Sequence, residues 1–340
     1  MHNPKTFSLK SSRQYCKHLT YQSKSSFVPA FRLLPSAKRE AMEILYAFNR
    51  FTDDLADEPL QPDEPDTRLA MLDEWRAVTE IALDDTAREK SNDAAFFNDI
   101  HEQFPNCNGI VLLPSVRYIL DQFNVPRDAL LQVIEGVTSD VEPQRFATFD
   151  DASAYCHQVA TAVGFAALAI WGTKEPLFSE PVIKAAQCCG IAFQWTNILR
   201  DLAEDYQNNR IYIPLDELNR VGFTEKQFGS LFDRKNWLAL KQPPKEKDAS
   251  ALFAHRENLR FIDEYEQKYY RLIGIQLQRC EGYYRTAWNL TNYIDSDGKK
   301  IFKKMYAAYH KLYEKIARRP NKILEGKIRL SVWDKIRLMF

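Results

Sequence analysis

The feature that most constrains this chain is that nearly every long segment repeats its apolar residues at helical spacing. In the segment that starts at Ser36, residues three or four apart form one apolar stripe: Ala41, Ile44, Leu45, Phe48 and Leu55. Such spacing predicts an amphipathic helix. Ser36 is expected to be its N-cap, and Pro59 is expected to help end it.

Comparable periodicity recurs along the chain. It predicts helices over Thr67–Ile81, Val116–Phe123, Arg127–Ile134, Ser153–Ile170, Pro181–Ala203, Phe253–Gln278, Glu281–Tyr293 and Lys299–Ala317. Arg210–Pro214 is too short to build a sheet, and Asp84–Asn106 and Lys241–Ala249 are polar enough to be linkers. No period of 20–50 residues repeats, which argues against a helical solenoid. The sequence therefore predicts one large all-α domain.

Charge and composition exclude several classes of protein. The chain has 46 basic and 46 acidic residues, so nothing global attracts it to nucleic acid or to an anionic membrane. With 45% apolar residues among 340, it has the apolar surface that disordered chains lack. Residues 1–20 have no apolar core, and Val159–Gly172 is too short to span a bilayer, so a cytoplasmic protein is expected.

Six cysteines are ordinary usage for this length, and they include no C-x-x-C pair. Cys188 and Cys189 are adjacent, which suits neither a zinc site nor a simple disulfide. Reduced thiols are therefore expected. Cys156 and His157 invite comparison with a nucleophile, but no spaced base and acid partner is visible. His157 lies two residues after Tyr155 and is predicted to point away from the side of the helix that carries Tyr155, as a core or surface histidine.

Two helices carry a polar stripe that ends in paired carboxylates. On the first, the residues that share the stripe are Tyr46, Arg50, Asp53 and Asp57; on the second, they are Gln187, Gln194, Asn197, Asp201 and Asp205. Carboxylates four residues apart converge on one point of the helix surface and repel each other unless a cation lies between them. Oxygen ligands of this kind suit Mg²⁺. One D-x-x-x-D pair is usually a solvated helix face, but two pairs on otherwise apolar helices favour metal binding.

These blocks resemble the squalene/phytoene synthase family of head-to-head prenyl synthases. The matching segments are KSSFVPAFRLLP (Lys24–Pro35), YAFNRFTDDLADE (Tyr46–Glu58), YCHQVATAVG (Tyr155–Gly164), FQWTNILRDLAED (Phe193–Asp205) and NRIYIPLDEL (Asn209–Leu218). The resemblance implies a single helical prenyl synthase domain over residues 24–340 with a central cavity, after an extension over residues 1–23. Asn209 and Lys327 depart from the family's usual Gly and Arg, and Asp84–Asn106 is longer than usual.

The resemblance also implies a chemistry. Two prenyl diphosphates are joined through their C1 carbons, with Mg²⁺, or alternatively Mn²⁺, neutralising the leaving diphosphate. The metal ligands it implies are Asp53, Asp57, Asn197, Asp201 and Asp205. The residues it implies for binding diphosphate are Lys24, Ser25, Ser26, Arg50, Arg200 and Arg210. For Arg200 a structural ion pair is an equal alternative.

An allylic cation must be kept from water, so the cavity is expected to be apolar. The residues expected to line it are Phe27, Tyr155, Val159, Ala160, Val163, Gly164 and Phe193. Tyr46 and Tyr309 are expected to stabilise the cation or hold a diphosphate oxygen, and Gln194 to orient water, metal or diphosphate. The alternative for the small residues Ala160 and Gly164 is helix–helix packing. The alternative for Tyr46 and Tyr309 is that each is a buried tyrosine making one structural hydrogen bond.

Several alternatives stay open from the sequence. The prenyl chain is C15, giving presqualene diphosphate or squalene, or C20, giving phytoene; the blocks favour C15. Class I terpene cyclases, head-to-tail prenyl synthases and a non-catalytic helical partner protein are the rival classes. NADPH use and the oligomeric state are undecided. The basic segment Lys315–Arg329 is a candidate for peripheral membrane contact, against a solvated helix end.

Overall fold

The computed structural model describes residues 7–23, 25, 28–57, 65–86, 94–245 and 248–330, without the side chains of residues 57 and 234. The described residues form fifteen α-helices: α1 (Leu9–Gln22), α2 (Ser36–Asp57), α3 (Pro65–Ala82), α4 (Ala94–Gln103), α5 (Leu113–Phe123), α6 (Arg127–Ser139), α7 (Phe149–Cys156), α8 (Ala162–Trp171), α9 (Glu180–Gln207), α10 (Leu215–Arg220), α11 (Glu225–Ser230), α12 (Arg234–Lys241), α13 (Ala249–Ala287), α14 (Leu290–Tyr293) and α15 (Ser296–Arg318). Shorter turns are η1 (Val28–Leu33), η3 (Asn108–Leu112), the π-helical η4 (His157–Thr161) and η5 (Pro320–Glu325). Apart from two isolated bridges, this part of the chain has no β-structure, which confirms the all-α prediction.

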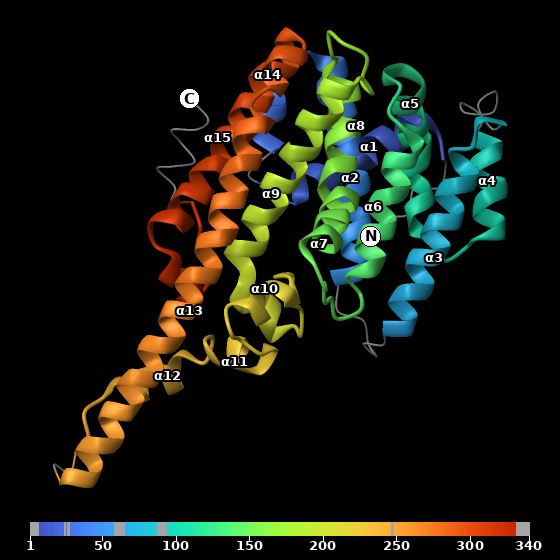
Figure 1. Ribbon diagram of the computed structural model, residues 1–340. Coiled ribbons are helices and arrows are strands. Elements are labelled where there is room, and N and C mark those ends of the chain that lie inside the picture. The colour runs from blue at the N-terminus through green and yellow to red at the C-terminus, as the bar shows by residue number, and fades with distance from the viewer. Residues whose placement is uncertain are drawn as a thin grey trace.

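The helices form a bundle around α9 (Figure 1). Helices α13 and α15 pack on one side of α9, while η4 and α8 pack on the other and are covered by α2 and α6. Helices α3, α4 and α5 complete the far side, and α1 packs along α2. The first half of α13 projects from the bundle together with α12 (Figure 1).

The core is divided between the two sides of the bundle. On the α2 side, Trp75 is fully buried against Phe48 and Phe51, and its indole N–H donates to Thr52 Oγ1 at 3.0 Å. On the α13 side, buried residues of α9 pack against buried residues of α13 and α15. Burying large aromatic side chains contributes about 1.5–3 kcal/mol each. Helix α1 joins the first of these cores, since Cys16 is fully buried within it.

The segment Phe149–Trp171 is one continuous helical run made of α7, η4 and α8. It is long and apolar enough to cross a membrane by length and composition alone, but it packs inside the bundle between α6 and α9. The π-helical turn interrupts the single α-helix that periodicity predicted over Ser153–Ile170. A π turn holds more than four residues, so it changes the faces that the two halves present.

Other boundaries differ from the sequence prediction. The linker interpretation of Asp84–Asn106 was wrong, because α4 forms within it and buries Phe97 and Ile100. The two helices predicted on either side of Cys280 are one helix, α13, of 39 residues. Ser36 was predicted as an N-cap, but α2 already begins there, and the Arg39 N–H donates to the Pro35 carbonyl at 2.9 Å.

All six cysteines are unpaired, as expected, and five of them are buried.

Candidate active site

A cavity of about 480 Å³ lies at the centre of the bundle and is lined by α2, α6, the α7–η4–α8 run, α9, α14 and α15. The sequence-predicted residues that line it are Tyr46, Arg50, Asp53, Tyr155, Val159, Ala160, Val163, Gly164, Phe193, Gln194, Asn197 and Tyr309. These residues are far apart in the sequence, and the fold brings them to one site.

The cavity is polar at one end and apolar at the other. Along α2 the lining runs from Asp53 to Met42, and along α9 from Asn197 to Ala186. Each run spans about 16 Å at 1.5 Å per residue. Trp171, Leu290, Phe302 and Met305 line the apolar end. This shape suits a ligand with a charged head and a long hydrocarbon tail.

Helix α2 supplies the acidic end. The Arg50 guanidinium pairs with Asp54, with 3.1 Å between Nε and Oδ2, because the two lie one helical turn apart. Oδ1 of Asn49 is buried and, within the described residues, has no hydrogen-bond partner. Asn49 lines the cavity one turn before Asp53 and was not predicted. The side chain of Asp57 lies outside the described part of the chain.

The α7–η4–α8 run supplies the apolar wall. Tyr155 and Gly164 both line the cavity, although nine residues at about 100° each would place them on opposite faces of an unbroken α-helix. The π-helical turn between them removes part of that rotation. At Gly164, an added Cβ would meet no atom within 4 Å, so the cavity is open there. His157 lies in the π turn beside Thr161 and is not part of the described lining, as expected.

Helices α9 and α15 meet at the third wall. The Tyr309 ring stacks on Phe193, and its hydroxyl hydrogen-bonds Asn197. Burial raises the pKa of Tyr309, which keeps the phenol protonated. Asn197 Nδ2 in turn donates to Gln194 Oε1 at 3.3 Å. Gln194, Asn197 and the Tyr309 hydroxyl form a continuous polar edge of the cavity. This edge leads toward Asp201 and Asp205, the second acidic pair.

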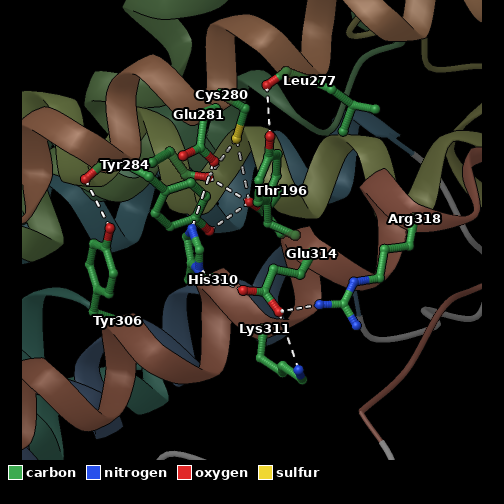
Figure 2. Close-up of polar contacts among 12 residues, drawn as sticks. Thr196, Leu277, Cys280, Glu281, Tyr284, Tyr306, His310, Lys311, Glu314 and Arg318 are labelled. Carbon is green, nitrogen blue, oxygen red and sulfur yellow. Dashed lines mark hydrogen bonds and ion pairs between the residues drawn. The ribbon is translucent and has the colours of Figure 1, made fainter.

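Contacts behind this wall hold α15 in place (Figure 2). The Tyr306 hydroxyl donates to the Tyr284 carbonyl at 3.0 Å, and the Tyr284 hydroxyl contacts Thr196 Oγ1 at 2.8 Å. His310 lies between Glu281 and Glu314, at 3.7 Å and 3.5 Å. The network joins α9, α13 and α15, and so it fixes the position of α15 beside the cavity.

The second acidic pair lies beyond the cavity lining. Arg200 forms an ion pair with Asp201, with 2.8 Å between Nε and Oδ1, and it is not among the described residues that line the cavity. Lys327 Nζ also contacts Asp201, at 3.2 Å, and Glu204 at 2.9 Å. Lys327, which stands where the family usually has Arg, therefore places its charge beside the Asp201 carboxylate.

Asp205 lies one turn further along α9. Burial, and then the charge of Asp201, raise the pKa of Asp205 to about 7, while Arg210 opposes the shift. Arg210 does not line the cavity; its guanidinium donates to the Asp140 carbonyl at 2.7 Å. A carboxylate that is costly to ionise next to another carboxylate is stabilised by a bound cation.

Asp140 is a cavity residue that sequence reasoning missed. It follows α6 as its C-cap and accepts hydrogen bonds from the Tyr155 hydroxyl at 2.7 Å and the Tyr212 hydroxyl at 2.9 Å. Its charge also contributes to the raised pKa of Asp205. No helical pattern marks a carboxylate at a helix end, so only the three-dimensional arrangement identifies it.

The N-terminal block is only partly described. Lys24, Ser26 and Phe27 lie outside the described residues. The Ser25 backbone N–H donates to Ser23 Oγ at 3.3 Å. Ser25 is not among the described residues that line the cavity.

The donor set at the acidic end consists of carboxylate and amide oxygens. Within the described residues, no three His, Cys, Asp or Glu side chains could hold one metal ion. Mg²⁺ commonly uses only one or two carboxylates, with substrate phosphates and water completing its shell. The orphaned Asn49 oxygen and the raised pKa of Asp205 fit a divalent cation held jointly with a phosphate ligand.

An all-α bundle whose central cavity has an oxygen-rich acidic end and an apolar end is suited to binding diphosphate esters of long hydrocarbons. Residues 20–242 match the model of the squalene/phytoene synthase family. The chain belongs to this family, whose members are prenyltransferases that join prenyl diphosphates head to head.

Individual relatives agree with this assignment. The chain is 32% identical to a phytoene synthase of Arthrospira platensis, over 66% of this chain and 67% of the relative. It is 31% identical to a presqualene diphosphate synthase of Sinorhizobium fredii, over 74% of this chain and 77% of the relative. A squalene synthase from Alicyclobacillus acidocaldarius shares the fold, with a TM-score of 0.65 at 18% identity over 94% of this chain and 97% of the other. The family assignment favours an enzyme over the non-catalytic partner protein.

Proposed function

We propose that this protein condenses two farnesyl diphosphate molecules head to head to form presqualene diphosphate, with release of one diphosphate and one proton, in a Mg²⁺-dependent reaction. The observation that carries the proposal is the single cavity whose lining changes from carboxylate and amide groups to hydrocarbon along both α2 and α9. A prenyl diphosphate has the same order of chemistry along its length.

The residues proposed to hold Mg²⁺ are Asp53, Asp57, Asn197, Asp201 and Asp205. When bound, the ion supplies Lewis-acid stabilisation of the departing diphosphate charge. Lys327 and Arg200 neutralise Asp201 in its absence, and both are cations that suit phosphate oxygens once the carboxylate is occupied. Arg50 and Arg210 are proposed to add charge at the same end of the cavity.

The remaining lining residues protect the reacting carbons. After the C1–O bond breaks, the allylic cation is captured by the second prenyl chain only if water is excluded. Val159, Ala160 and Val163 supply the apolar wall, and the phenols of Tyr46, Tyr155 and Tyr309 face the polar end. Phenol rings offer a negative π face to a nearby cation.

Phytoene formation from geranylgeranyl diphosphate is the second candidate function. It is favoured by the relatives named phytoene synthase and by the open space beside Gly164. Presqualene diphosphate formation is favoured by the presqualene diphosphate synthase of Sinorhizobium fredii, which aligns with a larger share of both chains than these two phytoene synthases do. In either case Trp171 and Phe302, which line the apolar end, are proposed to limit the length of the tail.

Product analysis tests the proposal. Purified protein with Mg²⁺ is incubated with farnesyl or geranylgeranyl diphosphate, each with and without NADPH, and the products are identified by mass spectrometry. Presqualene diphosphate from the C15 substrate is the expected result, and NADPH tests whether it is carried on to squalene. Phytoene from the C20 substrate with no C15 turnover would overturn the C15 assignment.

Variants then test the residues. Asp53→Ala and Asp201→Ala are expected to abolish product formation while the helical circular dichroism spectrum stays unchanged. Near-normal activity in both variants would contradict the metal assignment.

A further inference from the structure

Three side chains of α15 join this helix to α13 behind the cavity wall (Figure 2). Tyr306, His310 and Tyr313 lie three or four residues apart, so they share one face of α15. The Tyr306 hydroxyl donates to the Tyr284 carbonyl at 3.0 Å, and the Tyr313 hydroxyl donates to the Leu277 carbonyl at 3.0 Å. The backbones of α13 and α15 come close at few of the described positions, so these side chains set the distance between the two helices. We call the three side chains the α15 seam.

His310 is the member of the α15 seam that can carry a positive charge. Its Nε2 lies 3.7 Å from Oε2 of Glu281 on α13, and its Nδ1 lies 3.5 Å from Oε1 of Glu314 on α15. A neutral imidazole has one N–H donor, so only the imidazolium pairs with both carboxylates at once. The ring also lies 9° from parallel to that of Tyr306, with centroids 5.7 Å apart, where the π electrons attract a cation.

The link from His310 to Glu281 has no substitute on α15. Lys311 and Arg318 contact Oε2 of Glu314, at 3.2 Å and 3.5 Å, so Glu314 is compensated by cations of its own helix. Burial, and then the charge of Glu281, raise the pKa of the Tyr313 phenol, so that group stays neutral. Within the described residues, His310 is the cation of α15 that pairs with Glu281.

The titratable and charged groups around the α15 seam come from three helices. They are Cys189 on α9, Cys280, Glu281, Tyr284 and Arg285 on α13, and Tyr306, Lys311, Tyr313, Glu314 and Arg318 on α15.

The α15 seam is connected to the polar end of the cavity through Tyr309. This residue precedes His310 in the chain, lines the cavity and hydrogen-bonds Asn197 on α9. Thr196, next to Asn197, meets the Tyr284 hydroxyl of α13 at 2.8 Å, so α9 and α13 are held together at this level. Because neighbouring residues of a helix move together, a shift of α15 against α13 also moves the Tyr309 hydroxyl relative to Asn197.

We propose that protonated His310 is a positioning residue for the reaction. Its imidazolium ties Glu281 on α13 to Glu314 on α15 and so holds the Tyr309 hydroxyl at Asn197. A histidine side chain changes its charge between about pH 5 and 8, so loss of the proton releases the tie within this range and lowers turnover. The inference rests on the proposed function, because Tyr309 acts there at the polar end of the cavity.

A ratio of turnover rates tests the kinetic part. We compare kcat of the wild type and of His310→Gln, which is uncharged at every pH, from about pH 5.5 to 8.5 with saturating Mg²⁺ and the prenyl diphosphate that the protein condenses. Dividing the two values at each pH cancels the titration of other groups, Asp205 included. The wild type is expected to be about fivefold faster at pH 5.5 and equally fast at pH 8.5. The matched control is His255→Gln, a partly exposed histidine in the projecting half of α13, whose ratio should stay near one.

The Tyr309→Phe background shows whether the effect runs through the Tyr309 hydroxyl. In that background His310→Gln is expected to change kcat by a factor that does not depend on pH. A pH-dependent ratio of the same size in both backgrounds would overturn the inference, because the effect would then be one of general structure. A ratio that does not change with pH in the wild-type background would overturn it as well.

A measurement without substrate separates this inference from the proposed function. Urea denaturation of the wild type, His310→Gln, Glu281→Gln and the double variant gives the coupling free energy between the two side chains. Coupling is expected at pH 5.5 and should be absent at pH 8.5. Coupling of the same size at both pH values would overturn the inference whatever the substrate, whereas failure of the wild type to turn over any prenyl diphosphate would overturn the proposed function alone.

Discussion

The ring of Tyr309 on α15 lies flat against the ring of Phe193 on α9, with centroids 4.1 Å apart and planes 12° from parallel. The stack closes the cavity wall between two helices and leaves the Tyr309 hydroxyl on Asn197. Tyr309 is thereby fixed by apolar contact on its face and by a hydrogen bond at its tip.

Separate substitutions distinguish these two roles. Tyr309→Phe keeps the stack and removes the hydroxyl, so we expect the free energy of unfolding to fall by only about 1 kcal/mol and kcat to fall about tenfold, from the loss of one positioned polar contact. Phe193→Ala removes the stack and should lower the free energy of unfolding by about 2–4 kcal/mol. Thermal denaturation and steady-state kinetics measure both effects. Equal destabilisation by the two substitutions would contradict this division.

Gly164 is proposed to set the space available to the prenyl tail, because it lines the cavity and the space beside it is open. Gly164→Leu places a side chain in the open cavity, so we expect kcat/KM to fall more for the C20 than for the C15 substrate. Gly274→Leu on α13 is the matched control, because an added Cβ there also meets no atom within 4 Å but does not face the cavity. A parallel loss for both substrates in Gly164→Leu would show that Gly164 does not set tail length.

Asp140 offers a comparison between two tyrosines on one carboxylate. Tyr155 and Tyr212 both donate to Asp140, but only Tyr155 lines the cavity. Each Tyr→Phe change should cost about 1 kcal/mol of stability, since it leaves an oxygen of the partly buried Asp140 carboxylate with one donor fewer. Only Tyr155→Phe is expected to lower kcat. Equal kinetic loss in Tyr212→Phe would mean that Asp140 acts on the reaction through both hydroxyls.

Asp205 predicts a pH dependence of stability in the metal-free protein. Its pKa is raised to about 7 in the folded state, so its contribution to stability is fully present below the unfolded pKa of about 3.9 and is lost as the pH rises through 7. Asp205→Asn removes this loss and should stabilise the metal-free protein by about 1–2 kcal/mol at pH 8, after allowance for solvent screening. Urea denaturation at pH 5 and pH 8 measures the difference. If the variant and the wild type differed in stability by the same amount at pH 5 and at pH 8, the raised pKa of Asp205 would be contradicted.

The sequence predicted the parts of this molecule that depend on local periodicity. The stripe of α2 and the face of α9 are set by residues within one helix, so Asp53 and Asn197 could be placed before the fold was known. Helix α4 was missed because its few apolar residues lie in a polar segment, and only packing against α3 makes them core residues. Asp140 and Asn49 were missed for a related reason: their roles depend on residues from other helices or on burial.

The contacts of the basic residues also required the fold. A helical wheel locates Arg200 on α9 but does not show that Asp201, next to it in the chain, would be its partner. Lys327 reaches Asp201 across 126 positions of sequence, which no local pattern indicates.

The π-helical turn η4 contains an extra residue relative to an α-helical turn, and α7 and α8 are in register with the cavity only because of it. Deleting one residue from this turn would allow an unbroken α-helix and turn all of α8 by about 100° relative to α7. The helix could keep its backbone hydrogen bonds, yet the hydrocarbon wall would rotate away from the cavity. Chain length within these five residues is therefore as much a determinant of the binding site as the identity of any side chain in it.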